Sequence, residues 1–450
     1  MSFQHSPTLF AVLLAAIIPT GTALAQDSAK AADNAAEAVK VEIATPKLAF
    51  GYLSDPKTPP KDFFESLFTG KVHLNNRLRV EFADTTGRKS SIAITNRLRL
   101  GYETKAYNGF SIFAEMENVS TPDERAYFVP ATGDGSPSRT VIAEPPGTEI
   151  NQAFVRYKTA GFGESDVSLD LKIGRQRIIF DDSRFIGNIG WRQFEQTFDA
   201  ISINSNFGVE KLSVSYVYVW GVQRIFGPNG PNWDSESHFI RASYTFSPEI
   251  TVVPFAYLYD FNSDSPINSN NTYGARVTGQ IDRDKDDAED VFFNYELTYA
   301  RQTDAGDNPL SFDVDFFAAE GKLTKKGLGA LVVGYQFMGS DNGTYGFRFP
   351  VGTNHKFQGF ADLFLTTPAT GLQDLYATVM FEAPFGLKPA ITFHQFWSDQ
   401  GNTDLGQEVD LVVGKKINAN WSMLVKAAFF DGRNGGPDTS RIWLETTLQF

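Results

Sequence analysis

Four arginines stand at alternating positions of two neighbouring segments: Arg77 and Arg79 in the first, Arg97 and Arg99 in the second. A guanidinium group keeps its positive charge at any ordinary pH and binds a carboxylate through two parallel hydrogen bonds. Several such groups along a confined path concentrate anions, because walls of low dielectric constant focus the electric field. These residue types at this spacing would suit the binding or passage of anions such as uronic or organic acids.

The elements that must position these arginines are two β-strands within residues 71–103. Apolar and polar residues alternate there, which places them on opposite faces of an extended strand. Leu78 and Phe82 share one parity, whereas Arg77 and Arg79 share the other. If the apolar parity faces lipid, the polar parity lines an interior. The other basic residues with interior parity are Lys71, His73, Arg156, Lys172, Arg241 and Arg276.

Carboxylates also have interior parity, and they leave a second interpretation open. Arg and Glu on adjacent strands would neutralise one another across the wall, which gives a structural lattice in an unselective pore. The sequence alone keeps both a net basic path and a neutral lattice possible. The carboxylates concerned are Glu81, Glu103, Glu115, Glu117, Glu296, Glu408 and Asp410.

The alternating pattern recurs along residues 69–450 and predicts an all-β fold, a transmembrane antiparallel β-barrel of about 18 strands. Long and short connections should also alternate between the outer and inner ends of such a barrel. The outer connections 84–90 and the inner connection 281–290 break this rule. The other outer connections are 120–148, 177–196, 221–236, 261–271, 339–372 and 431–439, and the inner ones include 206–209, 247–249, 384–388 and 417–420.

The start of the chain and its composition fit an exported protein. Residues 1–25 read as a signal peptide cleaved between Ala25 and Gln26, and residues 26–68 as a flexible periplasmic segment. The sequence has no later apolar run long enough for a transmembrane helix. It has no cysteine, so it has neither a disulfide nor a thiolate metal site. The net charge of -13 argues against a nucleic-acid partner.

Two predicted outer connections hold further candidate residues. A connection folded inward would constrict the mouth, with Arg184, Trp191, Arg192 and His355 as the constricting side chains. The alternative is structural: glycines make tight turns there while the aromatic rings pack the base of the loop. For single residues we favour the structural interpretation.

Several segments resemble the alginate export family of outer-membrane proteins. These segments are EINQA at 149–153, GRQR at 174–177, RFIGN at 184–188, GWRQ at 190–193, TFDA at 197–200, HKFQGFADLF at 355–364 and GLQDLY at 371–376. The resemblance implies an eighteen-stranded monomeric barrel in a Gram-negative outer membrane, with an Arg- and Lys-rich pore. In the founding member of the family, this pore conducts secreted alginate. It also implies closure by an outer loop, here 120–148, and by a long periplasmic turn; the corresponding turn 417–420 is too short for that role.

We therefore expect an outer-membrane channel that passes polar, anionic solutes, or an anionic polysaccharide such as alginate, by diffusion. The expected partners are membrane lipid, lipopolysaccharide and the transported anion. Resemblance to outer-membrane proteins in general implies that the barrel-assembly machinery reads the last strand, which ends at Phe450. We expect no cofactor and no metal, and the acidic stretch 282–287 departs from a calcium loop and is interpreted as a solvated turn.

Two alternatives belong to other classes of protein. An outer-membrane hydrolase would need a nucleophile beside a base, and no sequence motif supplies that pair, so we predict that the protein is not an enzyme. A structural or adhesin barrel with a plugged lumen is the other alternative, and the long outer connections would suit it.

Overall fold

The computed structural model describes residues 51–161, 166–282 and 291–450. The predicted signal peptide, its cleavage site, residues 26–50 of the flexible segment and most of the turn 282–287 lie outside these residues. The strands of the main sheet are β1 (Gly51–Tyr52), β2 (Lys71–Thr85), β3 (Ser91–Glu103), β4 (Phe110–Ser120), β7 (Gly147–Thr159), β8 (Leu169–Gln176), β9 (Thr197–Ser205), β10 (Leu212–Gln223), β11 (Trp233–Ser247), β12 (Ile250–Tyr259), β13 (Asn270–Asp282), β14 (Val291–Asp304), β15 (Asp313–Lys325), β16 (Gly329–Met338), β19 (Leu372–Phe381), β20 (Leu387–Trp397), β21 (Asp404–Lys416), β22 (Trp421–Gly432) and β23 (Thr439–Gln449).

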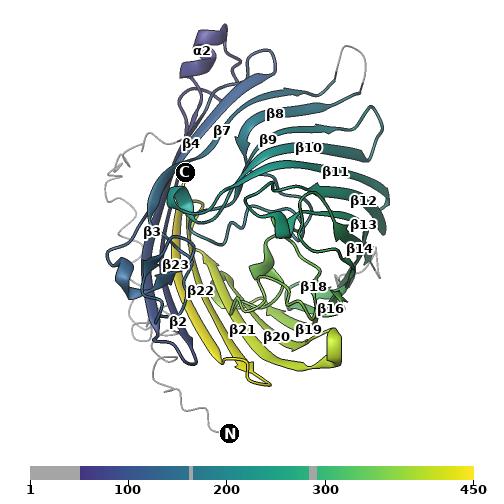
Figure 1. Cartoon of the computed structure of the whole chain (residues 1–450). Coiled ribbons are helices and arrows are strands. Elements are labelled where there is room, and N and C mark those ends of the chain that lie inside the picture. Colours follow the sequence, from purple (N-terminus) through teal and green to yellow (C-terminus); the bar gives the residue numbers. More distant parts are fainter. Residues whose placement is uncertain (1–50, 162–165, 283–290) are drawn as a thin grey trace, which may run out of the picture. The chain divides into compact units, whose positions relative to one another are not determined.

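The described strands form one antiparallel sheet that closes on itself. The sheet has 19 strands, and 18 of them, all except the two-residue β1, form a closed ring. The ring closes between β2 and β23, whose register runs from Asn75 opposite Gln449 to Thr85 opposite Thr439. Figure 1 shows this seam, where the yellow end of the chain meets its purple beginning. The predicted antiparallel β-barrel of about 18 strands is confirmed.

The two faces of the wall differ as the alternation predicts. Leu78, Ile92 and Leu100 point outward with exposed fractions of 41–47%. Arg79 and Arg97, of opposite parity, are buried in the interior. A strand that crosses a membrane needs an apolar outer face because hydrocarbon cannot solvate charge, and ring closure leaves no backbone edge unpaired.

Three long connections at the outer end run into the barrel. They are loop 121–146, with β5 (Phe128–Val129) and β6 (Asp134–Gly135), loop 177–196, and loop 339–371, with β17 (Ser340–Asp341) and β18 (Tyr345–Gly346). Loops 177–196 and 339–371 join through a parallel bridge between Ile186 and Val351. In Figure 1 the coils and turns of loops 177–196 and 339–371 lie within the ring of strands.

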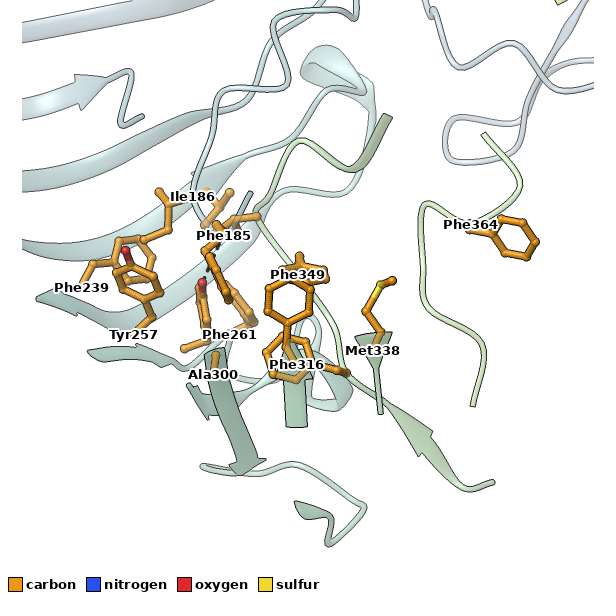
Figure 2. Packing of buried hydrophobic residues seen from close by; sticks show 14 of the residues in the cluster. Phe185, Ile186, Phe239, Tyr257, Phe261, Ala300, Phe316, Met338, Phe349 and Phe364 are labelled. Carbon is orange, nitrogen blue, oxygen red and sulfur yellow. Dashed lines mark hydrogen bonds between the residues drawn. The ribbon is translucent and has the colours of Figure 1, made fainter. Parts of the chain in front are cut away.

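The interior contains a hydrophobic core made by these loops and one part of the wall. Phe185 contributes from loop 177–196 and Phe349 from loop 339–371, while Tyr257 and Phe316 belong to strands β12 and β15. Figure 2 shows these rings packed together. The outer part of the lumen is therefore filled on this side by protein with the packing of a core.

The described residues before the barrel are attached to it. The helix α2 (Phe63–Phe68) begins at Asp62, whose side chain accepts a hydrogen bond from the Glu65 amide. β1 pairs with the start of β2. Residues 51–68, part of the segment expected to be flexible, thus have a defined structure. The remaining helices are 3-10 turns at Glu124–Ala126, Gly227–Asn229, Pro266–Asn268, Asn354–Lys356, Pro384–Gly386 and Gln400–Asn402. None of the helices in the described part of the chain is long and apolar enough to span a membrane.

Candidate channel site

The four arginines of the first hairpin lie side by side on the inner wall. Arg77 and Arg97 are direct cross-strand partners between β2 and β3, and Arg99 is paired with Asn75. All four guanidinium groups belong to buried residues. The strand register thus produces the basic cluster that the sequence spacing predicts, and the neighbours of each group decide how much charge stays available.

Arg79 is neutralised by two carboxylates. Its guanidinium donates to Glu144 of loop 121–146 at 3.1 Å and to Glu445 of β23 at 2.7 Å. It also lies 4.0 Å from the ring centroid of Trp191, in a cation–π contact. Arg79 therefore acts as the attachment point of two loops rather than as a free cation.

Arg99 and Arg177 share carboxylates with the wall and with loop 177–196. Arg99 Nε lies 2.5 Å from Glu117 Oε1, and its Nη2 lies 3.4 Å from Glu195 Oε1. Arg177 pairs with Glu195 and, at 2.9 Å, with Glu115. Burial alone would raise the pKa of Glu195, but the positive charges of Arg99 and Arg177 lower it to about 2.

Arg77 and Arg97 have weaker compensation. Arg77 donates to Gln193 Oε1 at 2.9 Å and to backbone carbonyls, and its closest carboxylate contact, with Glu445, is 3.9 Å. Arg97 donates to Asn75 Oδ1 and lies 3.9 Å from Glu117. Its Nε has no acceptor among the described residues. These two groups keep most of their positive potential.

A cavity of about 290 Å³ opens beside these two residues. Four arginines and one glutamate line it, so its charged lining has an excess of three positive charges. The lining residues are Asn75, Arg77, Arg97, Arg99, Arg177, Asn188, Gly190, Glu195 and Gln449. This arrangement can bind a small carboxylate or another anion.

The candidate loop residues Trp191, Arg192 and His355 meet in one cluster with Asp362 and Lys426. The rings of Trp191 and His355 stack with centroids 4.9 Å apart and 6° between their planes. Arg192 donates to Asp362 Oδ2 at 2.7 Å. Lys426 of β22 lies 4.1 Å from the Trp191 centroid. This cluster fastens loops 177–196 and 339–371 to each other and to the wall.

His355 is neutral in this cluster. Its Nδ1 is 2.6 Å from Asp362 Oδ1, and its Nε2 is 2.6 Å from Lys426 Nζ. Because an ammonium group only donates, Nε2 must accept and the ring proton sits on Nδ1. Burial lowers the pKa of His355 to about 3, despite the opposing charge of Asp362.

The aromatic side of the lumen contains a second cavity, of about 280 Å³. Phe185 is ringed by Phe255, Phe349 and Phe316 at centroid distances of 4.8–5.7 Å. The candidate Arg184 is buried beside them, 4.2 Å from the Phe349 centroid. Burial lowers the pKa of Arg184 to about 10. Both signs of charge line this cavity, so it has no basic excess like that beside Arg97.

The remaining predicted path residues lie apart from the cluster, and most of them are paired. Arg241 pairs with Asp181 at 2.5 Å, and Arg276 pairs with Glu296 and lies 3.7 Å from Asp181. Near the inner end, Arg156 pairs with Asp170, and His73 lies 3.5 Å from Glu103. Lys71, also at the inner end, stands opposite Glu103, and Lys172 of β8 lies 5.1 Å from the ring centroid of Phe154.

Four residues of this interior were not among the predicted site residues: Glu144, Glu195, Asp362 and Lys426. Three of them are carboxylates and the fourth is a base, and each has partners from loops or strands distant in sequence, so alternation could not pair them. Asp362 lies within the HKFQGFADLF segment, which resembles the alginate export family and could have marked this residue as a candidate. No group of three or more potential metal ligands occurs among the described residues.

The closed ring with an apolar outer face and a charged interior defines an outer-membrane β-barrel of the channel type. The sequence model of the alginate export family matches residues 73–340, and the chain belongs to that family. The protein therefore resides in the outer membrane of a Gram-negative bacterium, where its outer face contacts lipid. No curated protein sequence matches the chain.

Solved structures with the same fold share little sequence with it. OccAB2 of Acinetobacter baumannii aligns with a TM-score of 0.64 and 15% identity over 85% of this chain and 98% of that chain. OccAB4 of the same organism aligns with a TM-score of 0.63 and 12% identity over 84% of this chain and 98% of that chain. OpdK of Pseudomonas aeruginosa, whose structure was determined with vanillate, aligns with a TM-score of 0.61 and 12% identity over 84% of this chain and 98% of that chain.

Proposed function

We propose that the protein is a diffusion channel selective for small organic anions, without catalytic activity. The observation that carries this proposal is the cavity beside Arg77 and Arg97. Its lining has four guanidinium groups and one carboxylate, in a confined interior where charges are weakly screened. Arg77 and Arg97 have no carboxylate closer than 3.9 Å among the described residues. Rings of like charge are an established basis of pore selectivity.

The size of the solute follows from the loops. Loops 177–196 and 339–371 fill part of the outer lumen with a packed aromatic core. The cavities described above measure about 290 and 280 Å³, and two further ones, beside Lys322 and beside Lys172, measure about 410 and 330 Å³, so each has a volume suited to a small solute. A small carboxylate fits the weakly compensated Arg77–Arg97 pair through bidentate hydrogen bonds.

A second candidate function is passage of a polyuronate chain such as alginate. The match to the alginate export family over residues 73–340 favours it. An extended polysaccharide requires a continuous opening, so loops 177–196 and 339–371 would have to leave the lumen first. The basic wall around Arg97 would then face the chain of carboxylates.

The proposal includes partners and assembly. The protein acts as a monomer, as the likeness to the alginate export family implies, and ring closure between β2 and β23 leaves no edge of the ring for pairing with another subunit. The barrel-assembly machinery reads the last strand, where the backbone of Phe450 pairs with Leu74. His355, Asp362 and Lys426 form a hydrogen-bonded array, but the side chains of all three are buried and no hydroxyl or thiol nucleophile joins them among the described residues.

Uptake by proteoliposomes tests the proposal with solutes matched in size. Glucuronate and glucose differ chiefly in a carboxylate. We expect glucuronate to enter several-fold faster at equal concentration, and equal or slower entry would refute anion selectivity. Long uronate oligomers provide the second arm: entry of oligomers at the rate of glucuronate would favour the polysaccharide function instead.

A further inference from the structure

The helix α2, ahead of the barrel, presents an apolar face without a protein partner among the described residues. Phe64 and Phe68 are 70% and 74% exposed, and Phe63 is 49% exposed. At about 100° per residue these three side chains fall within an arc of roughly 140°. Ser66, which is buried, lies on the opposite side of the helix. The helix therefore turns its polar side to the barrel and its phenylalanines away from it.

This orientation is fixed by hydrogen bonds at both ends of the segment. Lys105 Nζ donates to the carbonyls of Asp55 and Thr58, and the Lys105 amide donates to the Ser66 carbonyl at 3.1 Å. The Tyr102 hydroxyl donates to the Leu67 carbonyl at 2.7 Å and accepts from the Gly70 amide at 2.9 Å. The phenylalanines cannot turn inward without breaking these bonds.

The same bonds locate the helix at the lipid side of the wall. Tyr102 has the outward parity of Leu98 and Leu100 on β3 and stands at the inner end of that strand. Its ring belongs to a group of aromatic residues at this end that includes Phe110 and Tyr157, whose centroids are 4.8 Å apart. Aromatic girdles mark the depth at which a barrel crosses the membrane interface. In Figure 1, α2 lies beyond the end of β4, where Phe110 begins the strand.

We propose that α2 is an interfacial anchor whose Phe63, Phe64 and Phe68 insert into the periplasmic leaflet of the outer membrane. The occupant of the apolar face is phospholipid. Tyr102, which holds the helix, stands on the lipid-facing surface of the wall, and the apolar face of the helix continues that surface. A short helix that lies in the interface with aromatic side chains toward the acyl chains is a known mode of attachment. This role is independent of the solute that the barrel passes.

Site-directed labelling tests the anchor in the intact protein, because the sequence has no cysteine and a single one is labelled uniquely. Full-length protein with F68C carries a polarity-sensitive fluorophore and is reconstituted into phosphatidylethanolamine–phosphatidylglycerol vesicles. Lipids brominated on the acyl chains and aqueous iodide then serve as opposing quenchers. We expect strong quenching by the brominated lipids and severalfold weaker quenching by iodide than for a label at K57C, an exposed position of the same segment.

A second labelled variant, F64C, protects the test if F68C folds poorly, and L100C on the lipid-facing wall provides the reference for full insertion. Quenching of both α2 labels by iodide at the level of K57C would overturn the proposal. Because only purified protein and lipid are present, that result would indicate that the apolar face of α2 binds another protein instead of lipid.

Discussion

Loop 177–196 contacts one side of the lumen through charged residues and the other side through aromatic residues. At its ends, Arg177 and Glu195 enter a network of charges with the basic wall, beside a cavity that keeps an excess of arginine. In its middle, Phe185 is enclosed by phenylalanines and tyrosines from the opposite strands and from loop 339–371. One side is polar and incompletely neutralised, whereas the other is packed like the core of a soluble protein.

This difference separates two tasks within one barrel. Apolar packing contributes stability without charge, so the aromatic side can hold the loops in the lumen. Guanidinium groups with few carboxylate partners attract anions, so the basic side can select solute. Arg79 and Arg192 are basic but do not select solute, because Glu144, Glu445 and Asp362 neutralise their charges.

The largest effect is expected from removal of the aromatic anchor. Phe185→Ala deletes a ring that touches several others and should destabilise the docked loop by about 3–5 kcal/mol. Single-channel conductance should then rise several-fold, because the loop leaves the lumen. Phe207→Ala is the matched control, since Phe207 lies in an inner turn and is 62% exposed. Unchanged conductance in F185A would mean that the charged side alone holds the loop.

A double-mutant cycle of Arg192 and Asp362 measures the ionic contribution to loop docking. Arg192→Met and Asp362→Asn should each speed the proteolysis of loop 339–371 in micelles, because each leaves a buried charge without its partner. In the double variant, loop docking should be weakened by less than the sum of the two single effects, with a coupling energy of about 1–3 kcal/mol. Strictly additive effects would show that the contact between these two residues contributes nothing to docking.

Loop docking should weaken in mild acid through His355. Burial lowers the pKa of His355 to about 3, whereas a histidine in an undocked loop titrates near about 6.5. The docked state therefore binds fewer protons, so docking has its full stability above pH ~6.5 and loses it progressively as the pH falls toward 3. Between pH 6.5 and 4.5 the loss is at most about 2–3 kcal/mol. Bilayer recordings should show longer openings over this interval.

His355→Gln tests the source of that pH dependence. The amide cannot take up a proton, so the change in open time between pH 6.5 and 4.5 should disappear. Glu195 does not interfere in this interval, because arginine charges lower its pKa to about 2 and its contribution is lost only as the pH falls from about 4 toward 2. The same pH response in H355Q would assign the effect to other groups.

The smallest effect is expected at the inner end of the barrel. Arg156 and Asp170 neutralise each other there and remain partly exposed. The charge-conserving double variant Arg156→Gln/Asp170→Asn should leave ion selectivity unchanged and alter stability by no more than about 1 kcal/mol. Reversal potentials in a salt gradient check this. A clear shift would show that the basic path extends to the inner opening.

The alternation of residue types was sufficient to predict the barrel, the approximate strand number and the interior position of the arginines, because a period of two is a local property of each strand. The neighbours of those arginines were not predictable in the same way. Glu144 reaches Arg79 from a loop 65 residues away. Asp362 reaches Arg192 across 170 residues. Long loops have no period, so their path into the lumen depends on side-chain packing that a single sequence does not specify.

The central claim is that the weakly compensated pair Arg77 and Arg97 makes the channel anion-selective. Reversal potentials across a planar bilayer with a salt gradient test it most directly, with wild-type protein, Arg77→Ser/Arg97→Ser and the neutral pair variant R156Q/D170N. The account predicts an anion-selective wild type, loss of roughly half or more of that preference in the arginine variant, and no change in the control. A cation-selective or unselective wild type, or full selectivity without both arginines, would contradict it.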